Sequence, residues 1–111
     1  MKRHWKSFDA KVTNREFGAL PIRDRVELFE AMKLYRLDVG IGYTIKNYGD
    51  GLLMIKPKDG QGRCLFFTEI ELDGQIELVA LLSYKKESQK LPEQHKRIAL
   101  QRRETYLENR K

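Results

Sequence analysis

Cysteine and histidine are scarce in this sequence, which contains one cysteine and two histidines. Cys64 has no second cysteine with which to form a disulfide within the chain. It lies in an apolar run, so we expect a buried thiol in a reduced, cytoplasmic protein rather than a catalytic nucleophile. His4 and His95 are far apart in the sequence and, with one cysteine, cannot make a structural zinc site. The sequence therefore predicts no bound metal and no cofactor.

Long apolar runs are also missing. No segment approaches the roughly 20 apolar residues of a membrane-spanning helix, and no apolar run follows the basic stretch Met1 to Lys6, so we expect neither a membrane partner nor a signal peptide. The sequence has no P-loop or dinucleotide-binding fingerprint, because Gly60-Gln61-Gly62 is expected in a hairpin and does not open a helix.

Positive charge is plentiful and unevenly distributed. The 111 residues carry a net charge of +6, and their number suits a single domain, residues 1–111. The excess of lysine and arginine lies in residues 1–6 and 84–111, whereas residues 7–83 are slightly acidic. A clustered basic surface is typical of a protein with a polyanionic partner, although a charged, solvated helix would give the same composition.

Three apolar segments in the middle of the chain predict an antiparallel meander. They run from Leu52 to Ile55, from Cys64 to Leu72 and from Ile76 to Leu82. A glycine-containing loop separates the first two, and Asp73-Gly74 separates the last two. Asp-Gly favours a two-residue type I′ hairpin, in which both central residues have positive φ.

Helices are predicted on both sides of this meander. We expect one from Asp9 to Leu20, with Asp9 as its N-cap, one from Pro21 to Asp38, and a basic amphipathic one from Pro92 to about Asn109. In the second helix, an apolar stripe at helical spacing is expected to face the core. It consists of Ile22, Val26 and Phe29, widened by Leu28, Met32 and Tyr35. The fold class is therefore α+β, a small antiparallel sheet packed by two N-terminal helices with a C-terminal basic helix.

Alternation along the strands predicts which side chains share a face. In the second strand, Cys64 and Phe66 should face the N-terminal helices, while Arg63 points the opposite way. The opposite face is also partly apolar, so a second layer or a partner should cover it. In the third strand we expect one face to hold Ile76, Leu78, Ala80, Leu82 and Tyr84.

The same strand order gathers cations at one end of the sheet. Lys56 ends the first strand, across the hairpin from Arg63 at the start of the second. Lys85 and Lys86 leave the third strand at this end if that strand is antiparallel to the second. We expect Arg63 to be exposed at the strand end, so that its removal changes stability little. Cations gathered in this way repel one another and favour a polyanionic ligand such as RNA.

Several motifs here resemble the phage-derived, HigB-like branch of the RelE/ParE toxin superfamily. The resemblance spans roughly Phe17 to Leu107. It is carried by Lys-Asn-Tyr-Gly-Asp-Gly-Leu at 46–52, by Gly62-Arg63, and by the segment Lys85-Lys86 … Gln89-Lys90 … Pro92. It implies an edge strand over Arg3 to Phe8. It also implies the toxin of a type II toxin–antitoxin pair, with a helix-turn-helix antitoxin as partner.

The resemblance implies that the protein cleaves messenger RNA on the ribosome. The implied catalytic residues are Arg63, Lys86 and Lys56, and the implied RNA-binding residues are Lys46, Lys58, Lys85 and Lys90. Two positions depart from the family pattern. Lys56 stands where arginine is common, which removes a planar bidentate donor, and Pro92 stands near the position of a tyrosine that some relatives carry.

Other interpretations remain open at this point. A ParE-like toxin shares the fold but inhibits DNA gyrase without being an enzyme, although such chains tend to lack the set of Arg63, Lys85 and Lys86. An RNA-binding phage remnant without activity is a third reading. Individually, the lysines can be solvated surface residues, and His95, on the apolar side of the last helix, is more easily read as a hydrogen-bonded core histidine than as a general base.

Overall fold

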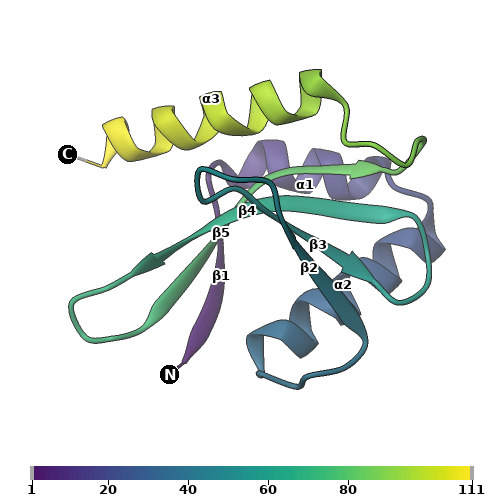
Figure 1. The fold of residues 1–111 in the computed structure, drawn as a ribbon, viewed down its shortest axis with the longest axis horizontal. Coiled ribbons are helices and arrows are strands. Elements are labelled where there is room, and N and C mark those ends of the chain that lie inside the picture. Colours follow the sequence, from purple (N-terminus) through teal and green to yellow (C-terminus); the bar gives the residue numbers. More distant parts are fainter. Residues whose placement is uncertain (1, 111) are drawn as a thin grey trace.

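A computed structural model describes residues 2–110 of the chain. Its elements are β1 (Arg3–Ser7), α1 (Ala10–Ala19), α2 (Ile22–Arg36), β2 (Tyr43–Asn47), β3 (Leu53–Pro57), β4 (Gly62–Ile70), β5 (Ile76–Lys85) and α3 (Glu93–Asn109). The strands form one five-stranded sheet in the order β1-β5-β4-β3-β2. Helices α1 and α2 cover one face and α3 covers the other (Figure 1). Within residues 2–110, no helix combines the length and the apolar character needed to cross a membrane.

The predicted α+β fold is confirmed, with one additional strand. Strands β3, β4 and β5 form the expected antiparallel meander, and the expected edge strand is present as β1, which pairs in parallel with β5. Strand β2, antiparallel to β3 at the other edge, was not predicted. Helix α3 supplies the second layer that the apolar residues of the far face required.

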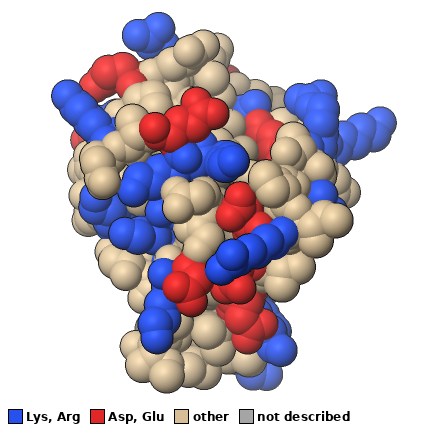
Figure 2. Space-filling view, turned by 90° about the vertical axis from the view of Figure 1, so that its right-hand side faces the viewer, with Lys and Arg blue, Asp and Glu red and all other residues tan. Residues whose placement is uncertain are grey.

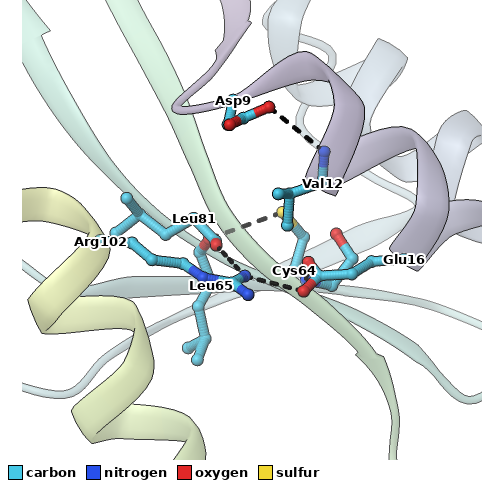
Figure 3. A network of polar contacts seen from close by, with 8 residues as sticks. Asp9, Val12, Glu16, Cys64, Leu65, Leu81 and Arg102 are labelled. Carbon is cyan, nitrogen blue, oxygen red and sulfur yellow. Dashed lines mark hydrogen bonds and ion pairs between the residues drawn. The ribbon is translucent and has the colours of Figure 1, made fainter. Parts of the chain in front are cut away.

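The helix boundaries follow local sequence chemistry. Asp9 caps α1 as predicted, because its Oδ1 accepts hydrogen bonds from the backbone N–H groups of Lys11 at 3.0 Å and Val12 at 3.3 Å (Figure 3). Pro21 directly precedes α2 instead of opening it. Its fixed φ suits a helix start, and its missing N–H loses no helical bond there.

The predicted buried stripe of α2 is wrong in part. Ile22, Val26 and Phe29 are 74%, 58% and 48% exposed. Leu28 and Met32, which widened the predicted stripe, are buried against the sheet as expected. The helix carries apolar residues on two faces, and the sheet can cover only one of them, so the N-terminal stripe is left at the surface.

The connection between β4 and β5 also differs from the prediction. Gly74 has φ +84°, but Asp73 does not have positive φ, so this is not a type I′ turn. The N–H of Gly74 donates to the carbonyl of Glu71 at 2.9 Å, and the N–H of Glu71 donates to the carbonyl of Gln75 at 2.8 Å. This pattern is that of a three-residue loop in which glycine takes the left-handed position.

A β-bulge changes the predicted faces of β5. Leu65 pairs with Leu82, but the next residue of β4, Phe66, pairs with Ala80, so Leu81 is the extra residue. The alternation therefore reverses after Leu81. Leu82 and Tyr84 lie on the α3 face, whereas the prediction placed them on the face of Ile76.

A polar cluster of Glu16, Arg102 and β5 backbone groups joins the two helical layers where β1 ends (Figure 3). Strand β1 stops pairing at Ala80 of β5, which leaves backbone groups of Leu81 and Ser83 without a neighbouring strand. Arg102 of α3 donates to the Leu81 carbonyl at 2.8 Å and to Glu16 of α1 at 2.8 Å. Glu16 in turn accepts from the Ser83 N–H at 3.1 Å. These side chains thus satisfy backbone groups of an otherwise open strand edge.

Candidate functional site

A pocket of about 350 Å³ lies on the α3 face of the sheet, between the strands and the segment leading to α3. Figure 1 shows this segment at the same end of the sheet as the β3–β4 connection. Every strand except β1 contributes to it, as does the start of α3. Its lining consists of Lys46, Tyr48, Met54, Lys56, Arg63, Tyr84, Lys85, Lys86, Glu87, Ser88, Gln89, Lys90, Leu91, Pro92 and His95.

Strand register explains why these residues meet. Arg63 pairs with Tyr84, and Gly62 with Lys85. The N–H of Lys86 then donates to the carbonyl of Gln61 at 2.7 Å, which fixes the start of the segment leading to α3. The predicted convergence of Lys56, Arg63, Lys85 and Lys86 is therefore what the structure shows.

Arg63 forms the buried base of the pocket. It is 4% exposed, so the expectation of a surface residue at the strand end is wrong; α3 and its leading segment cover this face. Its Nη1 donates to the carbonyls of Gly62 at 2.9 Å and Gly60 at 3.2 Å. Burial lowers the pKa of Arg63, although an arginine stays protonated at neutral pH. Among residues 2–110, no carboxylate forms an ion pair with it within 4.0 Å.

Lysines surround this guanidinium. Lys46, Lys56, Lys85, Lys86 and Lys90 all line the pocket, and none of them has an ion-pair partner within 4.0 Å in the described part of the chain. The one acidic residue in the lining is Glu87. Of the residues predicted from sequence, Lys58 alone lies outside the lining, on the exposed β3–β4 connection. Figure 2, viewed toward this end of the molecule, shows lysine and arginine side chains clustered on the surface beside a smaller acidic group.

Tyr48, Tyr84 and His95 are pocket residues that the sequence analysis did not select. Tyr84 reaches the site because the bulge in β5 reverses its side-chain direction. Its ring centroid is 4.4 Å from that of His95. Burial raises the pKa of Tyr84 to about 12 and also raises the pKa of Tyr48. Both phenols are therefore neutral at physiological pH and available as hydrogen-bond donors.

His95 is not the hydrogen-bonded core residue that we expected. Its Nδ1 is buried without a hydrogen-bond partner among residues 2–110, and its ring lines the pocket. Buried polar atoms usually have a partner, so an unpaired ring nitrogen here is free to bind a ligand or carry a proton. The signal in the sequence was its position three residues after Pro92, at the start of the helix that closes the pocket.

The arrangement suits an anion that carries several oxygen atoms. A guanidinium and several ammonium groups with no acidic partner repel one another, and a bound phosphate would relieve that repulsion. The tyrosines and the histidine add flat rings and neutral donors at the same place. Comparisons of this chain with protein-family models and with curated proteins found no match, so its function has to be inferred from this pocket.

Proposed function

We propose that the chain is the toxin of a type II toxin–antitoxin pair and that it cleaves messenger RNA on the ribosome, in the cytoplasm. The observation that carries the proposal is the buried guanidinium of Arg63, which forms no ion pair within 4.0 Å among residues 2–110 and lies at the base of a pocket lined by five lysines. A buried cation is destabilising unless something compensates it. A phosphodiester of RNA is such a compensating group, and the sequence resemblance to RelE-like toxins points to the same ligand.

The proposed reaction transfers the scissile phosphate to the neighbouring 2′-OH. The 2′ oxygen attacks phosphorus, the bond to the 5′ oxygen breaks, and the products are a 2′,3′-cyclic phosphate and a free 5′-OH. Negative charge grows on the equatorial oxygens and on the leaving oxygen during this step. Donors fixed in advance at those positions lower the barrier, and Arg63 is held in place by two carbonyl groups. Lys56 and Lys86 add positive charge from two sides.

Proton transfer requires a general acid or base, and His95 is the one histidine in the pocket lining, with a buried Nδ1 that has no hydrogen-bond partner among residues 2–110. It would take the proton of the 2′-OH or return one to the 5′ oxygen. Tyr84 packs against its ring and fixes the orientation of the imidazole. The remaining lysines, Lys46, Lys85 and Lys90, bind the phosphates on either side.

The cellular target separates this proposal from gyrase inhibition. Induction of the chain without its helix-turn-helix antitoxin should arrest growth, and amino-acid incorporation should fall within minutes while DNA stays supercoiled and unbroken. Early double-strand breaks with intact messages would instead support a ParE-like gyrase inhibitor. Unimpaired growth at confirmed high expression of folded protein would count against both toxins.

The site is tested by message cleavage on purified ribosomes. Loss of one fixed donor commonly lowers the rate by about 10²–10³. We therefore expect Arg63→Lys, which keeps the charge but loses the planar fork, to lower cleavage strongly, and Lys86→Ala to lower it more mildly. Lys33→Ala, an exposed lysine of α2 outside the pocket, is the matched control. Equal cleavage by all three variants and the wild type would refute the proposed site.

A further inference from the structure

A second group of charged side chains lies on the same sheet face, near the β4–β5 connection. Figure 1 shows this connection at the opposite end of the sheet from the β3–β4 connection. The potential ligand atoms of His4, Glu71 and Glu77 all lie within 4.8 Å of one another. They come from three segments. His4 of β1 is directly paired with Glu77 of β5, and Glu71 follows the end of β4. The sequence offered no sign of this set, because more than sixty residues separate His4 from the two glutamates.

Glu77 is the unusual member of this group. It is 7% exposed, and its Oε2 has no hydrogen-bond partner within the described residues 2–110. The nearest cation is Nζ of Lys6, 3.8 Å away, which is beyond hydrogen-bonding distance. By contrast, the neighbouring Glu69 on β4 is paired with Arg110. The buried Glu77 carboxylate therefore faces a second carboxylate and an imidazole, and its one nearby cation, Lys6, is too distant to donate a hydrogen bond to Oε2.

We propose that His4, Glu71 and Glu77 bind a divalent first-row transition-metal ion, with Zn²⁺ the best match. One imidazole nitrogen and two carboxylates form a donor set that zinc accepts in sites where a fourth position is held by water. Zinc bonds of about 2.0–2.2 Å place neighbouring donor atoms of a tetrahedron about 3.4 Å apart. The three side chains are thus close to a binding geometry and need small rotations to reach it. The imidazole favours zinc over magnesium or calcium, which prefer oxygen ligands.

Such an ion would join β1 to β5 and to the β4–β5 connection. It would replace the ion pair of Lys6 with Glu77, and the Lys6 side chain is exposed enough to move away. The pocket that contains Arg63 is at the other end of the sheet, so this metal site stands independently of the proposed nuclease activity.

To test this, Zn²⁺ is titrated into metal-free full-length protein, and binding is measured by calorimetry and by the change in melting temperature. We expect one ion per chain and a rise in Tm of about 10–15 °C when free zinc exceeds Kd by about 100-fold. Glu71→Gln and His4→Gln should each weaken binding at least about tenfold. Lys6→Met should strengthen it, because a competing cation is removed.

Two matched controls locate the ion. Glu30→Gln, an exposed glutamate of α2, and His95→Gln, the other histidine of the chain, should bind zinc as the wild type does. No binding by the wild type at about 1 mM zinc would overturn the proposal. So would unchanged binding by Glu71→Gln and His4→Gln, or loss of binding in His95→Gln. Equal affinity for Mg²⁺ and Zn²⁺ would overturn the nitrogen ligand and with it the proposed site.

Discussion

The ion pair between Glu16 and Arg102 should contribute more to stability than the other ion pairs described above. Arg102 makes two charge-assisted hydrogen bonds of 2.8 Å, one to Glu16 and one to the Leu81 carbonyl, and both side chains are largely shielded from water. Such bonds contribute about 1.5–3 kcal/mol each, and a shielded partner left unpaired adds a penalty. Allowing for the partial exposure of both groups, Arg102→Ala should lower the free energy of unfolding by about 2–4 kcal/mol.

Glu16→Ala should lower the same free energy by about 2–3 kcal/mol, because it leaves the Ser83 N–H and the Arg102 guanidinium without their shared acceptor. In the double variant, the loss in free energy of unfolding should be about 1–2 kcal/mol smaller than the sum of the two single losses. Urea denaturation followed by fluorescence measures these values, since Trp5 is the only tryptophan and its Nε1 donates to the Met32 carbonyl of α2 at 2.8 Å.

Arg97→Ala is the matched control, an exposed arginine on the same helix, which should change stability by less than about 0.5 kcal/mol. If Arg102→Ala lost no more stability than this control, or if the double variant were additive, the pair would not join α1 and α3 in the way described.

Three further predictions concern two glycines, the buried face of α2 and the Cys64 thiol. Gly62→Ala should destabilise the fold, because an added Cβ would lie 3.0 Å from a backbone carbonyl of α2, whereas Gly18→Ala, with nothing within 4 Å and a helical conformation, should stabilise it by about 0.5–1 kcal/mol; thermal melts of both decide the signs. Leu28→Ala should lower the free energy of unfolding by about 2–5 kcal/mol and Val26→Ala by far less, and similar losses in urea denaturation would refute the assigned helix face. Burial raises the pKa of the Cys64 thiol to about 12. The folded protein should therefore resist thiol reagents at pH 8, and its stability should decline as the pH rises from about 8.5 toward 12, because the unfolded chain ionises first; a Cys64→Ala variant should lose that part of the pH dependence.

Local sequence signals predicted the meander and the helices because each is encoded by short-range patterns. Apolar runs separated by glycine-containing turns specify β3 to β5, and Asp9 and Pro21 mark the helix starts. Strand β2 carried a weaker form of the same signal, with Tyr43 and Ile45 half-buried between exposed polar residues, but it is short and follows a glycine-rich segment.

The wrong predictions concern features that are determined by tertiary packing. Helix α2 has two apolar faces, and the sheet selected the one containing Leu28. The bulge at Leu81 shifts the alternation of β5, and nothing in the apolar run from 76 to 82 marks where that happens. Convergence of the basic residues followed from strand order alone. The burial of Arg63 and the arrival of Tyr84 and His95 in the pocket depended on the bulge and on the docking of α3.

The parallel pairing of β1 with β5 affects the order in which the protein takes shape during its own synthesis. Arg3 pairs with Ile76 and Ser7 with Ala80, so β1 has no partner strand until about seventy further residues have been translated. The lining of the basic pocket likewise extends to His95. Because a domain folds as a unit, the pocket can form only after the segment that contains His95 has been synthesised, long after Lys46 and Lys56.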